Sequence, residues 1–290
     1  MAPGVGTVVV DNASSDQTLE LLRARSGTRV ISNPKNRGFA AAVNQGVREA
    51  GESDFVLLLN PDVELLMPVD ELTESAQRYG LAAGRLVDRA GQTQVGFTVR
   101  RYPTPTALVC ELFGINRLWP SNPVNRRYRC LDQDYAQPAL VEQPAGAFLM
   151  VRRDVWKKLG GLDEQFYPVW FEDVDFCRRA VDSGYQIAYC PAVRARHEGG
   201  HSVGKIPVGR RATYWCVSLL RYGAKHFPSG TFRWICAAVA LSCIPRMVVG
   251  TIAGRTLSTV GIYLKTMQFA GHCLVNPKHV KNAEVTVRPL

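Results

Sequence analysis

The sequence predicts an α/β fold in which helices flank a mostly parallel sheet. Short apolar runs and helical patterns alternate over the first sixty residues, in the order strand, helix, strand, helix, strand. The third strand-like run, residues 55–59, is followed by Asn60-Pro61-Asp62. A carboxylate after a buried strand is how α/β enzymes place a metal ligand at the carboxyl edge of a sheet. A second acidic segment, residues 160–178, reads GGLDEQFYPVWFEDVDFCR and places carboxylates beside aromatic side chains. Together the two features indicate an enzyme.

Within the first sixty residues, each expected strand or helix is predicted from a local sequence pattern. A strand of small and β-branched residues is expected over 5–10, followed by a polar loop. Ser14 and Gln17 have the spacing of a helix capping box, so a helix begins there. A second short strand covers 29–32, and a helix of small residues covers 39–50. This order predicts parallel strands joined by helices.

The middle of the chain is less regular. Residues 86–144 contain six prolines and scattered aromatic residues, which indicates loops and short elements that cover a site. A strand is expected at 147–151 and a short helix at 154–159. A helix with one apolar face then covers 172–182, and a last strand covers 185–190.

Positive charge is concentrated in the last third of the chain. Residues 194–290 carry 14 Lys and Arg against two acidic residues, a net charge of +12, whereas residues 1–193 carry 21 against 23, a net charge of −2. This asymmetry indicates an anionic surface as partner. An apolar content of 46% with 21% charged residues excludes a disordered chain. Eight cysteines without a CxxC pair indicate reduced thiols in a cytoplasmic protein.

Residues 206–290 are expected to form a second, helical and basic region. Their longest stretch without a charge is 12 residues, 234–245, which is too short for a membrane span of about 20 apolar residues. Basic helices flanked by aromatic residues lie in the membrane interface. We therefore expect peripheral binding to an anionic membrane surface, at the inner face of the plasma membrane. The simpler alternative is a helical subdomain packed on the core. Nucleic acid is not expected as a partner.

Five motifs follow one another along the first 205 residues. They read VVVDNASSD (8–16), NxGFAAAxN (36–44), LLNPD (58–62), GAFLMVRR (146–153) and GGLDExFxxxxxEDVDxCR (160–178). In this order they resemble the family 2 inverting glycosyltransferases, in the branch typified by bacterial rhamnosyltransferases. The resemblance implies a GT-A fold, in which a nucleotide-sugar and a divalent metal ion, Mg²⁺ or Mn²⁺, lie at the carboxyl edge of the sheet.

The resemblance also implies roles for the acidic residues. Asp173 falls on the catalytic base of the family, with Glu172 beside it as a substrate-binding residue. Asn60 and Asp62 stand where the family carries its Asp-x-Asp metal motif. His197 falls where many relatives place a histidine near the diphosphate, which makes it a third candidate metal ligand.

On the donor side, the resemblance implies that Asp11 contacts the nucleotide. Asn36, Gly38 and Asn44, from the second motif, and Gly146, from the fourth, complete the expected substrate-binding set. The chemistry is coherent, because an inverting transfer needs one carboxylate to take the proton of the acceptor hydroxyl. It also needs a cation to stabilise the charge that develops on the departing diphosphate.

Each of these residues also has a purely structural explanation. Asp11 can cap the turn that follows its strand, and Asp62 can be an ordinary turn residue. Carboxylates at 172 and 173 are favoured at a helix N-terminus by the helix dipole whatever their role. His197 can be a simple loop histidine, and the glycines can serve only to permit close backbone packing.

The motifs begin with what would be the second strand of the family. A further strand, turn and helix are expected before Val5, from an upstream start. Without them, an open position in the sheet would leave backbone groups unpaired and weaken donor binding. The predicted organisation is therefore a glycosyltransferase domain over 1–205, lacking this first unit, followed by the helical region over 206–290.

The sequence predicts an inverting glycosyltransferase that uses a nucleotide-diphospho-sugar donor, with dTDP-L-rhamnose as the first expectation. The acceptor is expected to be a cell-surface glycan or a lipid-linked sugar. A truncated, inactive relative that serves as a membrane-binding or partner-binding module is the alternative. A nucleotidyltransferase on a similar sheet is a third possibility, and it predicts a Gly-rich phosphate loop with Arg or Lys near the N-terminus, which the sequence does not show.

Overall fold

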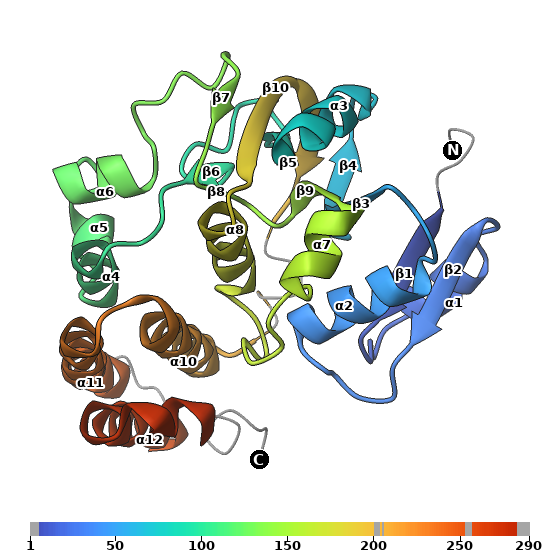
Figure 1. Cartoon of the computed structure of the whole chain (residues 1–290). Coiled ribbons are helices and arrows are strands. Elements are labelled where there is room, and N and C mark those ends of the chain that lie inside the picture. The colour runs from blue at the N-terminus through green and yellow to red at the C-terminus, as the bar shows by residue number, and fades with distance from the viewer. Residues whose placement is uncertain (1–5, 200–203, 205, 253–256, 283–290) are drawn as a thin grey trace.

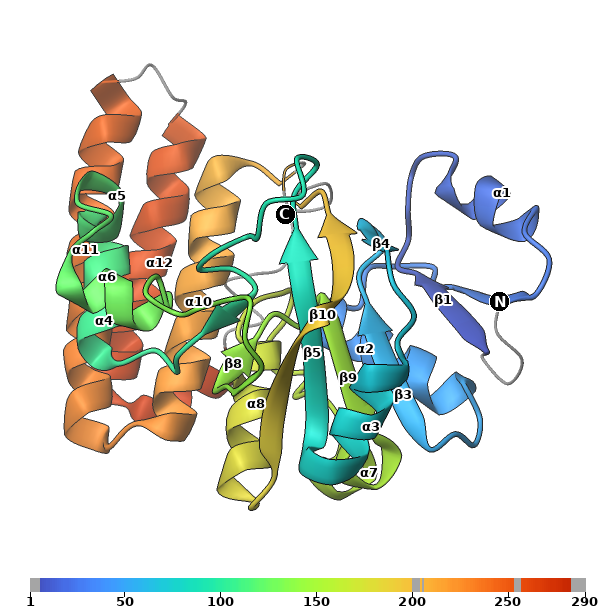
Figure 2. The same ribbon diagram turned by 90° about the horizontal axis from the view of Figure 1, so that it is seen from above.

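The computed structural model describes residues 6–199, 204, 206–252 and 257–282 (Figure 1). The first two thirds of the chain build a layer of strands with helices packed against it. The last third builds three long helices that pack together beside this layer (Figure 2). The α/β class predicted from the sequence is confirmed, and so is the helical character of the C-terminal region.

The opening of the chain forms a small sheet of its own. Its elements are β1 (Thr7–Asp11), α1 (Thr18–Arg23), β2 (Thr28–Ser32) and α2 (Phe39–Glu49). Strands β1 and β2 pair in parallel. Helix α2 packs closely on β1, because a Cβ atom added to Gly46 would lie 3.2 Å from a methyl group of Val10.

The capping box predicted at the start of α1 is not formed. Gln17 is the N-cap residue, but its side chain makes no capping hydrogen bond. The backbone N–H of Ser14 donates instead to Oδ1 of Asp11, so this serine belongs to the turn after β1. Asp16 takes the capping role and accepts a hydrogen bond from the N–H of Thr18 at 3.1 Å.

The central sheet has the strand order β3-β9-β5-β10-β4, and β7 also pairs with β10. The strands are β3 (Phe55–Leu59), β4 (Val63–Leu65), β5 (Gly80–Val87), β7 (Ala139–Leu140), β9 (Phe148–Arg152) and β10 (Gln186–His197). Among the described strands of this sheet, β5 and β10 are the parallel pair, and the other pairs are antiparallel. The sheet is thus more mixed than expected, because β9 runs in the opposite direction between β3 and β5.

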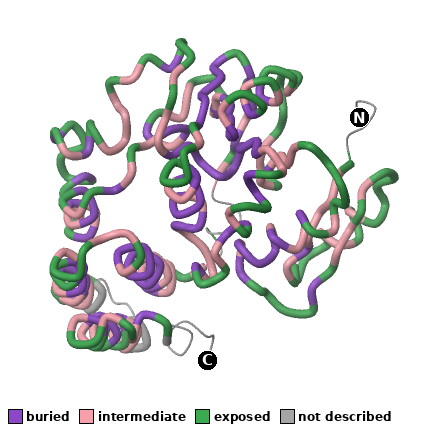
Figure 3. Tube along the Cα trace, in the orientation of Figure 1, coloured by how far each residue is buried: buried purple, intermediate pink, exposed green. Residues whose placement is uncertain are grey.

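Helices cover both faces of the central sheet (Figure 1). They are α3 (Asp70–Tyr79) on one face, and α7 (Arg153–Leu159) and α8 (Glu172–Asp182) together with α2 on the other. Side chains alternate along β5, so that Leu81 packs with Phe176 of α8, whereas its neighbour Ala82 packs with Leu72 of α3. Figure 3 shows the strands and the inner sides of these helices as buried.

The region predicted as loops and short elements contains short helices and one small strand pair. These are α4 (Pro105–Leu112), α5 (Ile115–Leu118), α6 (Pro123–Tyr128), β6 (Val99–Arg100) and β8 (Gln143–Pro144). The three long C-terminal helices follow: α10 (Val208–His226), α11 (Ser229–Ile252) and α12 (Leu257–Val275), with the 3₁₀ helix η1 (Pro277–Asn282) after them.

The long helices share a core with the rest of the molecule. Leu219, Phe232 and Cys273 pack in one buried cluster with Leu108 of α4 and with Phe171, the residue before α8. This apolar cluster crosses the boundary expected at residue 205. The division into two domains stays a prediction.

Helix α11 corrects one expectation. Its segment Ser229–Val249 has a mean hydropathy of 1.6, so by length and composition alone it could cross a membrane. The longest uncharged stretch in the sequence ends at Pro245, but the helix continues through this proline and through Arg246. Of this segment, 39% is buried inside the protein.

Strands β1 and β3 each have one edge without a neighbour among the described strands. Strand β1 pairs with β2 on one side, and β3 pairs with β9 on one side. Helix α2 packs against both strands, through Gly46 on β1 and through Ala40 and Val47 on Leu58 of β3. The further strand expected before Val5 stays a prediction.

Candidate active site

Asp173 lies at the N-terminus of α8, where the chain makes an abrupt turn. Trp170 and Phe171 both adopt left-handed backbone conformations, with φ of 77° and 70°. Such conformations are costly for bulky residues and persist where the surrounding structure imposes them. The turn leaves the Asp173 side chain half-buried and within reach of solvent.

The Asp173 carboxylate is held by backbone donors on both oxygens. The N–H of Gly146 donates to Oδ2 at 3.0 Å, and the N–H of Val174 donates to Oδ1 at 2.8 Å. A Cβ atom at position 146 would lie 2.8 Å from the Asp173 Cβ, so this approach requires glycine. The two hydrogen bonds fix the position and orientation of the carboxylate.

The turn that carries Asn60 and Asp62 meets the same segment. The N–H of Asn60 donates to the carbonyl oxygen of Ala147 at 3.0 Å, and the Asn60 carbonyl accepts from the N–H of Val63 at 3.0 Å. Because Ala147 follows Gly146, one short segment joins the end of β3 to the N-terminus of α8. The structure therefore brings Asp62 and Asp173 to one region of the molecule.

His197 lies at the end of β10 and faces Asp62. Its Nε2 is 3.6 Å from Oδ1 of Asp62, and the ring stacks on Phe97 with a centroid distance of 4.9 Å. Burial lowers the pKa of His197, although the Asp62 charge acts in the opposite direction. The neutral imidazole is the form that binds metal ions.

Gln94 determines which His197 nitrogen carries the proton. Its side-chain N–H donates to the His197 carbonyl at 2.8 Å, so the Gln94 oxygen is the atom that faces Nδ1 of His197, at 2.9 Å. Nδ1 must therefore donate, and the lone pair of Nε2 is directed toward the Asp62 side. Metal-binding histidines typically donate a hydrogen bond of this kind from the ring nitrogen that does not bind the metal. Gln94 was not predicted from the sequence, because it lies in the irregular region and belongs to none of the five motifs.

Asp62 and His197 suit a divalent metal ion. A carboxylate oxygen and an imidazole nitrogen are a donor pair that Mn²⁺ accepts, and Mg²⁺ and Mn²⁺ take further ligands from substrate phosphates and water. No group of three or more His, Cys, Asp or Glu suited to a metal occurs among the described residues. The protein would thus supply a small part of the ligand set, which is the pattern of metal ions that bind together with a diphosphate.

The two loops that carry the predicted donor-binding residues are tied together by Asn12, for which the sequence predicted no role. The Asn12 amide donates to Oδ1 of Asn36 at 3.0 Å and to the carbonyl of Gly38 at 3.1 Å, and its oxygen accepts from the N–H of Arg37. Asp11, at the end of β1, is buried and accepts from the N–H of Ser14. Asp11, Asn36 and Gly38 are therefore neighbours, and their role in donor binding stays a prediction.

Gly38 connects these loops to the segment that leads to Asp173. The N–H of Phe39 donates to the Pro168 carbonyl at 2.8 Å, and a Cβ atom on Gly38 would lie 2.8 Å from the ring of Tyr167. Gly38 has φ of 85°, which glycine adopts without strain. A larger residue would push apart the donor-side loop and the segment that leads to the candidate base.

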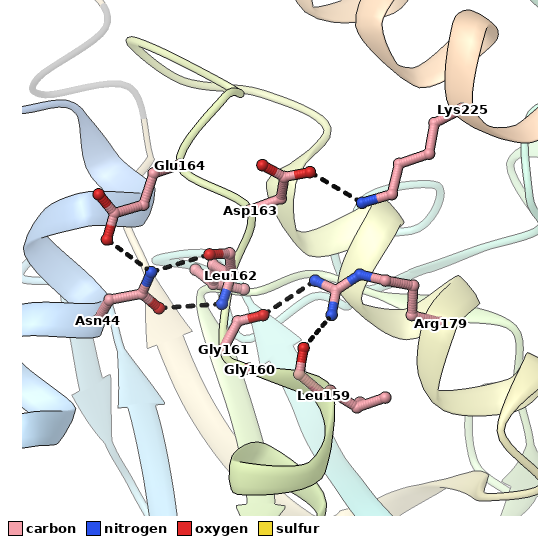
Figure 4. Close-up of a pocket in the computed structure, with 9 residues that line it drawn as sticks. All are labelled: Asn44, Leu159, Gly160, Gly161, Leu162, Asp163, Glu164, Arg179 and Lys225. Carbon is pink, nitrogen blue, oxygen red and sulfur yellow. Dashed lines mark hydrogen bonds and ion pairs between the residues drawn. The ribbon is translucent and has the colours of Figure 1, made fainter.

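The side-chain amide of Asn44 is already occupied. It accepts a hydrogen bond from the N–H of Leu162 at 2.9 Å, and it donates to the Leu162 carbonyl and to Glu164 (Figure 4). These bonds link α2 to the loop after Gly161. The expected role of Asn44 in substrate binding stays a prediction.

This link lines a polar cavity of about 380 Å³, shown in Figure 4. Its lining includes Asn44, Asp163, Arg179 and Lys225, and it contains none of the residues around Asp173 or Asp62. Its charges are largely paired with one another, because Lys225 contacts Asp163 at 2.8 Å and Arg179 donates to two carbonyls of the same loop. We therefore place the candidate site at Asp62, Asp173 and His197, where the chemistry requires it, and not in this cavity.

Glu172, beside the candidate base, is a buried acid, and one of its two carboxyl oxygens has no hydrogen-bond partner among the described residues. Its side chain is 4% exposed, and no described residue makes a hydrogen bond to its Oε2 atom. Burial raises the pKa of Glu172 well above its usual value, and the Asp173 charge adds to this effect. The Glu172 carboxyl is therefore neutral over a range in which an exposed glutamate is ionised.

We expect Glu172→Gln to stabilise the protein progressively as the pH rises. The unfolded chain ionises Glu172 near its ordinary pKa of about 4.3, whereas the folded protein keeps the proton to a higher pH. The wild type therefore loses stability above pH about 4.3, by about 1.4 kcal/mol for each unit by which the pKa is raised, and the glutamine variant does not. Denaturant unfolding of both proteins at pH 4.5, 6 and 8 measures this. A constant difference between them would contradict a neutral Glu172.

Comparison with known proteins identifies the class of activity. Residues 5–159, more than half of the chain, match Glycosyl transferase family 2, and residues 126–213 match Glycosyltransferase like family 2. The chain belongs to glycosyl transferase family 2. It is therefore a glycosyltransferase that moves a sugar from a nucleotide-sugar, and the family predicted from the five motifs is confirmed.

The relatives with named activities include two rhamnosyltransferases. N-acetylglucosaminyl-diphospho-decaprenol L-rhamnosyltransferase of Mycobacterium tuberculosis is 28% identical over 253 residues, which cover 79% of this chain and 77% of that protein. Rhamnosyltransferase WbbL of Escherichia coli K12 is 23% identical over 205 residues, covering 67% of this chain and 73% of that protein. Among solved structures, the glycosyltransferase resembles mannosyltransferase PcManGT from Pyrobaculum calidifontis, with 16% identity, a TM-score of 0.45, and coverage of 97% of this chain and 76% of that one.

Proposed function

We propose that this glycosyltransferase is an inverting enzyme that transfers L-rhamnose from dTDP-L-rhamnose to a lipid-linked or cell-surface glycan acceptor at the inner face of the plasma membrane. One observation carries the proposal. A solvent-accessible carboxylate, Asp173, is fixed by the Gly146 N–H on the segment that also holds the turn of Asp62. The named activities of the two relatives support rhamnose as the sugar, and the Mycobacterium tuberculosis relative supports a lipid-linked acceptor.

Asp173 is the residue that we assign as general base. In an inverting transfer, the acceptor hydroxyl attacks the anomeric carbon from the side opposite the leaving diphosphate, and its proton passes to a carboxylate. The backbone donors at Gly146 and Val174 hold the Asp173 carboxylate in one orientation without protonating it. Such prior positioning lowers the entropy cost of reaching the transition state.

Asp62 and His197 are the residues that would hold a divalent metal ion, with Asn60 on the same turn as Asp62. The ion would neutralise the negative charge that builds up on the leaving diphosphate. Gln94 contributes by directing the His197 Nε2 lone pair toward Asp62. Asp11, Asn36 and Gly38 would bind the donor, and Asn44 would position the loop after Gly161.

Thermal unfolding with a panel of donors tests this proposal. The full chain is heated with Mn²⁺ and dTDP-L-rhamnose, UDP-glucose, UDP-N-acetylglucosamine or GDP-mannose. A donor at 100 times its Kd adds about 2.7 kcal/mol to stability, which is readily measured. We expect dTDP-L-rhamnose to give the largest rise in Tm, and Asp62→Ala to reduce it.

Proton NMR of the transfer product then tests inversion directly, because the two anomeric configurations give different coupling constants. Retention of configuration would overturn the assignment of Asp173 as sole base. The absence of a Tm shift with every donor would favour the alternative that the protein is an inactive binding module.

Gln94→Leu is expected to weaken Mn²⁺ binding by about tenfold to 100-fold, the usual cost of losing a second contact to a metal-binding histidine. Titration calorimetry with Mn²⁺ and dTDP measures the affinity without any turnover. Gln92→Leu, at an exposed position on the same loop, is the matched control and should bind Mn²⁺ as the wild type does. Equal affinities for the two variants would show that Gln94 does not orient a metal ligand.

A further inference from the structure

Helix α11 carries an exposed apolar stripe. Trp234, Leu241, Ile244 and Val248 are 78%, 56%, 47% and 53% exposed, and their spacing of seven, three and four residues places them on one face of the helix. An exposed tryptophan at one end of such a stripe is unusual for a surface that faces only water. The stripe requires a partner that is itself apolar.

The opposite face of α11 is packed inside the protein. Cys236, Val239 and Cys243 are fully buried in or beside the cluster shared with α10 and α12. Arg246 donates to the Leu112 carbonyl at 2.7 Å, which ties this part of α11 to the end of α4. A helix attached to the protein along one side is suited to lie on a membrane surface rather than to cross it.

The charges around this surface specify the kind of membrane. Helices α10, α11 and α12 contain no acidic residue in their described spans. Arg233 on α11, Arg117 on α5 and Lys265 on α12 are exposed. A second protein copy with the same surface would bring like charges together, whereas anionic lipid headgroups attract each cation.

We propose that the exposed stripe of α11 binds the interface of an anionic bilayer. Trp234, Leu241, Ile244 and Val248 enter the boundary between headgroups and acyl chains, while Arg233, beside Trp234, contacts the headgroups. The proposal deepens the proposed function, because a lipid-linked acceptor would be met at this same bilayer surface. Only this link between the membrane surface and the acceptor rests on the proposed function.

Vesicle flotation of the full chain tests this surface. The variant combines Trp234→Ser, Leu241→Gln and Val248→Gln, and vesicles of phosphatidylcholine are compared with vesicles that also contain phosphatidylglycerol. The matched control changes three other exposed apolar residues to Gln, namely Leu21, Val95 and Leu140. We expect the wild type and the control to float with the anionic vesicles, and the variant to bind at least about tenfold more weakly, because it loses three apolar insertions.

Several results would overturn the proposal. Equal flotation of variant and control, or no flotation of the wild type, would exclude this face. Resistance of the bound wild type to alkaline carbonate extraction would indicate a spanning helix instead. A dimer in size-exclusion chromatography that only the variant loses, without flotation, would indicate a second copy as the occupant. Flotation needs neither donor nor acceptor, so its outcome is independent of the donor panel that tests the proposed function.

Discussion

Asp173→Asn is expected to lower kcat by about 10²- to 10⁴-fold, the range that a positioned general base contributes. Asparagine keeps the size and one oxygen of aspartate, so the hydrogen bond from the Gly146 N–H at 3.0 Å can persist. What the variant loses is the ability to accept the proton of the acceptor hydroxyl. KM for the donor and the donor-induced rise in Tm should therefore remain close to those of the wild type.

The control for this variant is Asp182→Asn on the same helix. Asp182 is exposed and pairs with Arg178 at the far end of α8, so its loss removes a carboxylate without touching the site. Unchanged turnover in Asp173→Asn would remove the base assignment. Loss of donor binding would indicate instead that Asp173 contacts the donor.

The sequence was most informative where local pattern and chemistry coincide. The bounds of β3 and α8 were predicted to the residue, because one is a pure apolar run before a proline turn and the other has acidic residues at its start and a glycine after its end. The same acidic start contains Asp173. Asp62 and His197 were predicted as one site, and the structure places them 3.6 Å apart. Their roles stay predictions.

The remaining features depend on contacts that local pattern does not contain. The direction of β9 between β3 and β5 is decided by tertiary packing, so the sheet could not be predicted as mixed. Gln94 belongs to no motif, and the first motif contains Asn12 without indicating its role, because their partners lie 103 and 24 to 26 residues away. Asn44 stands in a motif, but the motif does not reveal that its amide binds the chain 118 residues later.

Asp175→Asn is expected to destabilise the protein strongly. Asp175 is fully buried, two residues after the candidate base. Its Oδ1 lies 2.8 Å from both His226 and Lys225, and its Oδ2 accepts from Arg179 at 2.7 Å. Arg179 in turn holds the carbonyls of Leu159 and Gly161 (Figure 4). This one carboxylate therefore joins α8 to α10 and to the loop before the site.

The loss of stability in Asp175→Asn arises because Lys225 and Arg179 lose their counter-ion. Removing one partner of a buried charge network costs about 3–5 kcal/mol. We expect the lower end, about 3 kcal/mol, because Lys225 and Arg179 can turn toward water. A loss of this size lowers the Tm of a chain of this length by roughly 5–10 °C. Since α8 would also be held less firmly, kcat should fall with little change in the KM for the donor.

The pH dependence distinguishes this charge effect from a simple loss of packing. Burial alone would raise the pKa of Asp175, but the hydrogen bond from His226, the Arg179 charge and the hydrogen bonds from Lys225 and Arg179 outweigh it and lower the pKa to about 2. In the unfolded chain the pKa is about 3.9. The folded carboxylate therefore contributes about 2 to 3 kcal/mol of stability that is present above pH about 4 and is lost as the pH falls toward 2.

The difference in stability between the wild type and Asp175→Asn should thus shrink steadily as the pH falls from 5 to 2. Denaturant unfolding at pH 5, 4, 3 and 2 measures it, and Asp182→Asn again serves as the exposed control on the same helix. A difference that stays constant over this range would mean that Asp175 stabilises the fold through shape and neutral hydrogen bonds. In that case the hypothesis that ionic interactions hold α10 to α8, the helix that carries Asp173, would be wrong.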